Sequence, residues 1–426
     1  MMNLSRLKKP LLIIAFILSI VLIGYLLWKL FFQDSLPVQT PSGQVNTSTS
    51  GGLPLINSNG NQDDGEITGP GRLPDGSIPN EGETDVPIGS RDPQATQTQT
   101  IANGGLTETK AIVISKSLSP SLSSDGSVKY YNREDGFFYK IDKNGNAVKL
   151  SDKIFHQVKD VTWAPNTNKA IIEYPDGTKI SYDFNTNKQV TLPSYWEEFS
   201  FSPDGEQITT KSIGLDSDNR WLVVSGADAS KATALESIGD RADYVYPSWS
   251  PNNQIVAYYT KGVDFDRQEV FFVGLNGENF KSTIVEGRGV QTQWSTEGDN
   301  LLYSAYHSRD DYKPKLWIVG SSGDNIGADR RSLEINTWAD KCTFASNTEI
   351  YCAVPETLEA GAGMFPELAD RTKDNLYKID LNTGAKTLIA IPNGAYNISQ
   401  ILVPEDQDYL YFTDKHNEMI YQIQLR

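Results

Sequence analysis

The chain has 426 residues, with 54 acidic and 38 basic side chains and a formal net charge of −16. This length allows either two domains or one large β domain. An acidic chain is unsuited to non-specific nucleic-acid binding, because neutralising phosphates requires a basic face. We therefore expect no nucleic-acid partner, and we expect most of the charge to be solvated.

A basic segment and a long apolar run begin the chain. Residues 1–9 contain Arg6, Lys8 and Lys9, and residues 10–32 are almost continuously apolar. The run is long enough to cross a bilayer core of about 30 Å, and the basic side chains before it favour a cytoplasmic N-terminus. A cleaved signal peptide is the alternative, but it usually has a shorter core and a small-residue cleavage site. The sequence predicts a single-pass signal anchor at 10–32, with the remaining chain outside the cytoplasm.

Residues 33–108 are rich in Ser, Thr, Asn, Gly, Gln and Pro and contain almost no aromatic residues. Such a composition cannot bury enough apolar surface to offset the entropy of ordering. We expect a disordered linker with a root-mean-square span of roughly 45–50 Å. A degenerate small domain is the alternative.

One repeated phrase organises residues 109–426: an aromatic residue, a small residue, proline or a substitute, and then a polar turn. Its copies recur at intervals of roughly 40–60 residues, the period of a four-stranded propeller blade. The aromatic side chain would fill the wedge between neighbouring blades, and proline, which lacks an N–H, would end the strand pairing. The clearest copies are Trp163-Ala164-Pro165, Phe201-Ser202-Pro203, Trp249-Ser250-Pro251, Trp294-Ser295-Thr296 and Phe344-Ala345-Ser346, with weaker ones at Leu122 and Val403.

These copies predict an all-β fold, a β-propeller of seven four-stranded blades. The last repeat lacks an outer strand, and residues 110–115 form a lone strand that can close the ring and remove an exposed edge. A six-bladed ring would require merging the first repeat with the last, and a β-sandwich is a further alternative. The predicted blades are 118–152, 157–193, 195–240, 243–288, 289–338, 340–393, and 396–426 with 110–115.

The two cysteines, Cys342 and Cys352, flank one predicted hairpin symmetrically about Asn347, with Phe344 opposite Ile350. Opposed residues of an antiparallel pair are within disulfide reach. A bridge suits a domain outside the cytoplasm. The alternative is two buried thiols on one face of the core.

The phrases Phe201-Ser202-Pro203-Asp204-Gly205 and Trp249-Ser250-Pro251-Asn252-Asn253 resemble the TolB-type repeat, a WD-like blade. The resemblance covers roughly 118–426 and is specific to the blade. It implies a protein-binding platform in a bacterial envelope. The chain departs from TolB-type proteins in its seven predicted blades, its predicted retained anchor and its lack of a separate α/β domain. It also resembles the propellers of prolyl oligopeptidase-like enzymes, but no residues remain for a hydrolase domain.

Catalytic motifs are sparse in the sequence. The three histidines, His156, His307 and His416, fall in different predicted blades without metal-ligand spacing, and neither a Gly-x-Ser-x-Gly elbow nor a His-Glu-x-x-His helix is present. A glycosidase needs only two suitably separated carboxylates, so enzymatic activity stays open although we favour a binding protein. Trp196 and Trp338 are either packing residues or glycan-stacking platforms.

The predicted loops between second and third strands are long, and they share one face with the connections between blades. Loops carry function on a rigid scaffold, so we expect this face to contact a ligand or partner, and the opposite face to have short turns. The candidate binding residues are Asp216, Asp218, Asp264, Asp266, Arg267, Arg309, Asp310, Tyr312, Met364 and Phe365.

Met364 and Phe365 are candidate interface anchors, unless their loop folds inward and plugs the central channel. The Asp-x-Asp pairs Asp216/Asp218 and Asp264/Asp266 are candidate Ca²⁺ ligands, with solvated turn acids as the alternative; we expect no other cofactor. Together these observations predict a membrane-anchored, extracytoplasmic propeller that binds an envelope protein or cell-wall component. A carbohydrate-active or lactone-hydrolysing enzyme and a ligand-binding sensor are the alternatives. The sequence does not indicate an oligomeric state.

Overall fold

The computed structural model describes residues 97–426, except 143–144, together with Leu18 and Leu22. Among these residues no helix is long and apolar enough to cross a membrane. The cytoplasmic segment 1–9, nearly all of the anchor 10–32 and most of the linker 33–108 lie outside the described residues. Those three assignments remain predictions.

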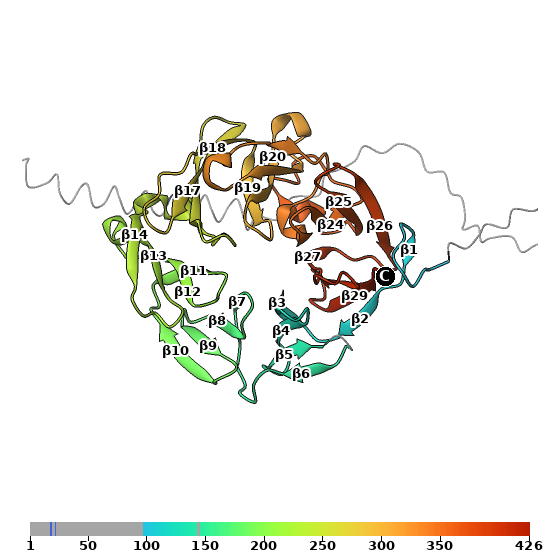
Figure 1. The fold of residues 1–426 in the computed structure, drawn as a ribbon, viewed down its shortest axis with the longest axis horizontal. Coiled ribbons are helices and arrows are strands. Elements are labelled where there is room, and N and C mark those ends of the chain that lie inside the picture. The colour runs from blue at the N-terminus through green and yellow to red at the C-terminus, as the bar shows by residue number, and fades with distance from the viewer. Residues whose placement is uncertain (1–17, 19–21, 23–96, 143–144) are drawn as a thin grey trace, which may run out of the picture. The chain divides into compact units, whose positions relative to one another are not determined.

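Seven sheets form a ring around a central axis, with the first strand of each sheet nearest the centre (Figure 1). The seven-bladed prediction is confirmed, and the six-bladed alternative is wrong. The strands of blades one to three are β3 (Ser117–Leu122), β4 (Val128–Asn132), β5 (Phe138–Ile141) and β6 (Ala147–Lys149); β7 (Asp160–Trp163), β8 (Lys169–Glu173), β9 (Lys179–Asp183) and β10 (Lys188–Leu192); β11 (Trp196–Phe201), β12 (Gln207–Ser212), β13 (Trp221–Gly226) and β14 (Thr233–Ser237).

The later blades follow the same antiparallel order, and from blade three onward short 3₁₀ helices interrupt several connections. These helices are η1 (Ser217–Asn219), η2 (Gly239–Tyr244), η3 (Ser308–Asp310), η4 (Gly323–Asn325), η5 (Ala339–Lys341) and η6 (Pro366–Ala369). The strands of blades four to six are β15 (Val245–Pro247), β16 (Ile255–Gly262), β17 (Arg267–Gly274) and β18 (Thr283–Glu286); β19 (Arg288–Trp294), β20 (Asn300–Tyr306), β21 (Pro314–Gly320) and β22 (Arg331–Ser332); β23 (Cys342–Ser346), β24 (Glu349–Pro355), β25 (Asp374–Asp380) and β26 (Lys386–Pro392).

Blade seven is completed by the N-terminal part of the domain, as the sequence predicted. It consists of β27 (Ile398–Leu402), β28 (Tyr409–Asp414), β29 (Ile420–Gln424) and β2 (Lys110–Val113). Strand β2 pairs antiparallel with β29, with Lys110 opposite Gln422. The ring is therefore closed by strands from opposite ends of the domain, which leaves no open blade edge at the junction.

The ordered domain begins before residue 109, where the sequence placed the end of the linker. Strand β1 (Leu106–Thr107) pairs parallel with β26 as a fifth strand of blade six. Upstream of it, the Ala102 N–H donates to the Gln424 carbonyl at 2.9 Å, and the Gly104 N–H donates to the Ile389 carbonyl at 2.7 Å. Composition alone missed this segment because its attachment uses backbone groups, which every residue carries.

The repeated phrase has the same structural role in each blade. The aromatic side chain packs between its own blade and the preceding one, in separate clusters that contain Trp163, Phe201, Trp249, Trp294 or Phe344. The small residue closes the turn where it is serine: Ser250 Oγ accepts from the Ile255 N–H at 3.0 Å and donates to Asn252 at 2.6 Å. Each blade interface therefore has its own apolar core, and hydrogen bonds within the turns fix the backbone at the border of that core.

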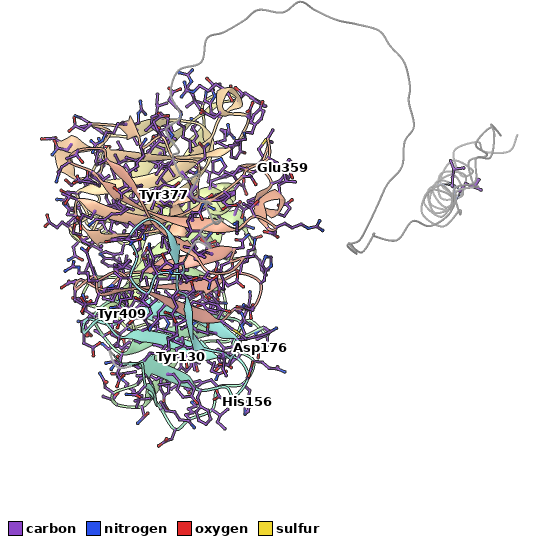
Figure 2. The ribbon with its side chains drawn as sticks, turned by 90° about the vertical axis from the view of Figure 1, so that its right-hand side faces the viewer. Tyr130, His156, Asp176, Glu359, Tyr377 and Tyr409 are labelled. Atoms are coloured by element: carbon purple, nitrogen blue, oxygen red, sulfur yellow. A yellow bond between two sulfur atoms is a disulfide. The ribbon has the colours of Figure 1, made fainter. Side chains whose placement is uncertain are left out.

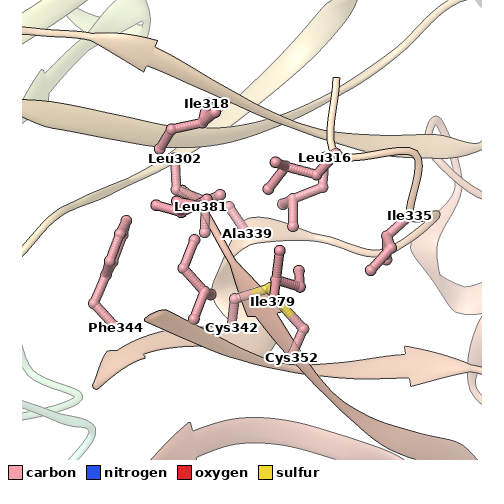
Figure 3. Packing of buried hydrophobic residues seen from close by; sticks show 12 residues of the cluster. Leu302, Leu316, Ile318, Ile335, Ala339, Cys342, Phe344, Cys352, Ile379 and Leu381 are labelled. Atoms are coloured by element: carbon pink, nitrogen blue, oxygen red, sulfur yellow. A yellow bond between two sulfur atoms is a disulfide. The ribbon is translucent and has the colours of Figure 1, made fainter. Parts of the chain in front are cut away.

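The interface between blades five and six illustrates this packing (Figure 3). Leu302 and Leu316 of blade five lie against Ile350 and Ile379 of blade six, all fully buried. Burying a leucine or isoleucine side chain stabilises a fold by roughly 1.5–3 kcal/mol.

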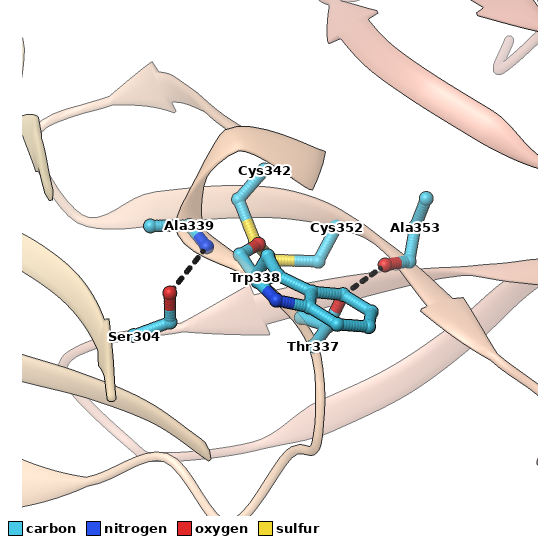
Figure 4. The surroundings of a disulfide bond; sticks show 7 residues. All are labelled: Ser304, Thr337, Trp338, Ala339, Cys342, Cys352 and Ala353. Atoms are coloured by element: carbon cyan, nitrogen blue, oxygen red, sulfur yellow. Dashed lines mark hydrogen bonds between the residues drawn. A yellow bond between two sulfur atoms is a disulfide. The ribbon is translucent and has the colours of Figure 1, made fainter. Parts of the chain in front are cut away.

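Cys342 and Cys352 form a disulfide in this interface, with their Cα atoms 4.0 Å apart (Figure 4). The residues are directly opposed in β23 and β24, and Phe344 faces Ile350. The predicted pairing is confirmed. Nearby, the Thr337 hydroxyl donates to the Ala353 carbonyl at 2.6 Å, which satisfies a buried polar group beside the bridge.

Candidate functional site

The second-to-third-strand loops and the connections between blades lie on one face of the ring, which we call the long-loop face. Glu359, Asp176 and His156 come from three such connections and lie along the same side of the molecule, whereas Tyr409 lies toward the other (Figure 2). The opposite face carries the repeated aromatic turns, and we call it the turn face. Its connections are not all short: 274–283 and 320–331 are extended. The predicted asymmetry in length is therefore partial.

The long loops of blades four and five are joined to each other. Asp266 accepts hydrogen bonds from the N–H and the hydroxyl of Ser308, at 3.2 and 2.7 Å. The ring of Phe265 meets the ring of Tyr312 edge-on, with centroids 6.4 Å apart. Edge-on contact is a favoured geometry for aromatic pairs. The two loops are thus joined by both a polar and an aromatic contact.

The loop of blade six docks on the loop of blade five through its glycines. The Gly361 N–H donates to the Asp311 carbonyl at 2.7 Å, and the Gly363 N–H donates to the Tyr312 carbonyl at 2.8 Å. A Cβ atom at Gly363 would lie 2.5 Å from the Cβ of Tyr306, so only glycine allows this approach. Asp311 and Tyr312 have φ angles of 55° and 54°, an uncommon conformation that persists where surrounding contacts impose it.

A buried polar network holds the far end of the same loop. The Lys341 ammonium lies 3.0 and 2.9 Å from the two carboxylate oxygens of Asp374 and donates to the Asn397 side chain at 3.3 Å. The amide of Asn397 donates to the Ala369 carbonyl in η6 at 2.8 Å. Burial raises the pKa of the Asp374 carboxyl, and the neighbouring Lys341 charge opposes that rise. The loop is therefore tied to blade seven as well as to blade five.

We call the three joined stretches 262–267, 306–313 and 356–373 the loop ridge. Its apolar side chains are exposed: 73% of Phe265, 53% of Phe365 and 42% of Met364 is accessible to solvent. Met364 and Phe365 do not plug the channel. Instead, Ala362 turns inward and packs against Trp338 and Ala369.

Exposed apolar side chains gather on the long-loop face more widely. Among the described residues of the propeller, no large exposed apolar side chain lies in a connection of the turn face. A contiguous or clustered apolar surface on a soluble domain usually marks an interaction site. Those in connections of the long-loop face are Ile114, Ile154, Tyr195, Leu215, Tyr244, Val263, Phe265, Met364, Phe365 and Leu368.

The structure does not bring the Asp-x-Asp pairs together. Asp264 accepts from Arg267 at 2.7 Å, which lowers the pKa of the Asp264 carboxyl, and the Ser308 hydroxyl likewise lowers the pKa of Asp266. Asp216 and Asp218 lie one blade away at η1 and are exposed. Within the described part of the chain, no group of three or more His, Cys, Asp or Glu side chains is placed to hold a metal ion. The calcium site therefore remains an expectation that this geometry does not favour.

The other predicted charged residues form local ion pairs on the loop ridge. Arg309 lies 3.9 Å from Glu286 and 3.8 Å from Asp310, and Asp310 also pairs with Lys315 at 3.3 Å. Such exposed pairs contribute little to stability, typically below about 1 kcal/mol. Their positions nevertheless fix a charged border around the apolar side chains.

No known family model matches the sequence, and sequence comparison detects no characterised relative. The fold does match solved structures. An oligogalacturonate lyase in complex with manganese superposes with a TM-score of 0.53 at 13% identity, over 78% of this chain and 96% of the lyase. The propeller domain of Cps50 (Swd1) from Myceliophteria thermophila gives a TM-score of 0.49 at 13% identity, over 75% of this chain and all of that domain. At these identities the likeness shows the propeller fold alone.

A cavity of about 780 Å³ opens at the channel mouth of the long-loop face, lined by residues of blades two to five. Glu173 and Asp160 are directly opposed in β8 and β7 within its lining. Burial, with the Asp160 charge as a smaller contribution, raises the pKa of the Glu173 carboxyl. Sequence reasoning missed this pair because its residues belong to no recognisable motif.

Trp196 is buried between blades two and three, and Trp338 is buried beneath the loop of blade six, so both are packing residues and do not form exposed stacking platforms. The Lys341 network was also missed, since its members come from positions far apart in the chain. One signal was present: Lys341 directly precedes β23 and Asp374 begins β25, both on the long-loop side of blade six.

Proposed function

We propose that this chain is a membrane-tethered, extracytoplasmic β-propeller that binds a protein of the cell envelope through the loop ridge. The observation that carries the proposal is the exposure of Phe265, Met364 and Phe365 on loops that are fastened to one another and to the core. Aromatic and methionine side chains are enriched at the centres of interfaces. Fastened loops lose little conformational entropy on binding, which favours affinity.

The tether follows from the apolar run at 10–32 and the polar linker, both of which are sequence predictions. The anchor would fix the protein at the membrane, and the linker would set how far the propeller reaches. The TolB-like turns are consistent with this proposal by analogy alone, because a fold does not determine a function.

The proposal can be tested by affinity capture from envelope extract with the fragment 97–426. A matched fragment carries Met364→Ser and Phe365→Ser, which remove exposed side chains and leave the fold unchanged. We expect a protein retained by the first fragment and reduced at least tenfold on the second. Equal retention by both folded fragments would refute the role of the loop ridge.

A carbohydrate-active enzyme is the second candidate, favoured by the channel-mouth cavity with its opposed Glu173 and Asp160. If neither fragment retains a protein, oligosaccharide turnover by the wild-type domain becomes the measurement of choice. Turnover that Glu173→Gln leaves unchanged would rule out this carboxylate as a catalytic group.

A further inference from the structure

We infer that the loop ridge recognises a basic, apolar protein segment: one that places apolar side chains on Phe265, Met364 and Phe365 and carries lysine or arginine beside them. This inference rests on the proposed function and specifies the chemistry of the partner. It follows from the charges that border the exposed side chains and from how those charges are paired.

The loop ridge has an excess of carboxylates. Its three stretches contain eight acidic and five basic side chains, within a domain that is itself acidic. Opposite charge across an interface increases the rate of association and selects among partners. A cationic partner segment therefore matches this surface, whereas an acidic one is repelled.

Most charges of the loop ridge are already paired within the protein. Arg267 pairs with Asp264 at 2.6 Å, Lys373 with Glu356 at 3.1 Å, and Asp370 with Lys415 outside the ridge. The charge of each paired group is largely compensated within the protein, so it attracts a charged partner only weakly. These pairs make the border of the loop ridge polar and restrain its side chains.

Two carboxylates differ from these. Among the described residues, the carboxylates of Glu359 and Glu367 have no ion-pair or hydrogen-bond partner, although their backbone carbonyls accept from Ala362 and Asp370, and both side chains are exposed. They lie on either side of Met364 and Phe365 in the same fastened loop. Arg371, at the end of the loop, is likewise unpaired. The apolar anchors are thus flanked in sequence by two free negative charges, an arrangement suited to lysine or arginine on both sides of an apolar insertion.

Other occupants fit less well. A second copy of this chain would bring the same carboxylates against each other, and like charges at an interface cost affinity. Anionic lipid headgroups would be repelled for the same reason. A neutral apolar segment would cover Phe265 and Phe365 but would leave the charges of Glu359 and Glu367 partly desolvated and unpaired, which is unfavourable.

The test is selection of displayed random 12-residue peptides on the 97–426 domain at low salt, followed by affinity measurement with one enriched synthetic peptide. We expect enriched sequences to combine aromatic or aliphatic residues with lysine or arginine. We expect the Met364→Ser/Phe365→Ser variant to weaken binding at least tenfold and the Glu359→Gln/Glu367→Gln variant to weaken it about three- to tenfold. Raising the salt from 50 to 500 mM should weaken wild-type binding similarly, because screening acts on exposed charges.

The matched control is Asp216→Asn/Asp218→Asn, which removes two exposed carboxylates from the same face one blade away and should change affinity less than twofold. Enriched peptides that are neutral or acidic, or whose binding is unaffected by Glu359→Gln/Glu367→Gln, would overturn this inference and leave the proposed function standing. Failure to enrich any peptide, or binding that ignores Met364→Ser/Phe365→Ser, would overturn both.

Discussion

The two faces of the propeller are built from the same blades but by different rules. On the turn face, the connections after the inner strands repeat one solution: an apolar side chain, aromatic in blades two to six, in the wedge between blades and a serine or its substitute closing the turn. On the long-loop face, the connections of blades four, five and six differ in length and bond to one another. Repetition marks the face that holds the ring together, and irregular loops that bond to one another mark the face that we propose for binding.

Two buried lysines show the same contrast in electrostatic terms. Lys341, beneath the long-loop face, has Asp374 as a partner. Lys129, between blades one and two near the turn face, donates to the Thr167 carbonyl at 2.9 Å and lies 4.9 Å from the ring centre of Trp163. Within the described chain it has no carboxylate at ion-pair distance. Removing Lys341 should therefore lower the free energy of unfolding, whereas removing Lys129 should raise it at pH 7.

The larger effect is expected at the long-loop face. Lys341→Met leaves the Asp374 carboxylate buried without its counter-charge, and we expect the free energy of unfolding to fall by about 3–5 kcal/mol. The double variant Lys341→Met/Asp374→Leu should recover part of this loss, since no unpaired charge remains. Urea unfolding measures both effects, and hydrogen exchange in 356–373 should rise in the single variant. A loss below about 1 kcal/mol would show that the network does not fasten the loop.

The smaller effect is expected near the turn face. Burial lowers the pKa of Lys129 to about 8, so between pH 8 and its unfolded value near 10.5 the unfolded state binds more protons and wild-type stability rises with pH. The variant Lys129→Met lacks this titrating group, so its stability does not change with pH for this reason. At pH 7 we expect the variant to be more stable than wild type, and this difference should shrink by at most about 3 kcal/mol between pH 8 and 10.5.

The measurement is urea unfolding of both proteins at several pH values between 7 and 10.5. Lys188→Met, which removes an exposed lysine of blade two, is the control and should show no such trend. If the difference in free energy of unfolding between Lys129→Met and wild type stays constant with pH, the lowered pKa of buried Lys129 is not the cause of the stability difference.

The sequence was sufficient for the architecture because the fold is periodic. Seven copies of one turn predicted seven blades, and the missing outer strand of the last repeat predicted closure by residues near 110. The cysteine pair was predictable for a local reason, since Cys342 and Cys352 flank one hairpin and oppose each other by register. Short-range patterns of this kind survive in a single sequence.

The candidate binding face was predictable only in part. Loop length drew attention to Met364 and Phe365, which are exposed, but nothing in the sequence indicated that Gly361 and Gly363 bond to Asp311 and Tyr312. The sequence offered Asp264 and Asp266 as candidate calcium ligands or as solvated turn acids, and it did not indicate that they accept hydrogen bonds from Arg267 and Ser308. Contacts between loops of different blades depend on the closed ring, so no local pattern encodes them.

The most direct test of the account is site-specific photo-crosslinking in cells that make the full chain. A photoreactive residue would replace Phe265 or Phe365 on the loop ridge, or Glu405, an exposed residue of the turn face. The account predicts a discrete protein adduct from the two ridge positions and none from Glu405. An adduct from Glu405 alone, or the same adduct from all three positions, would contradict the assignment of binding to the long-loop face.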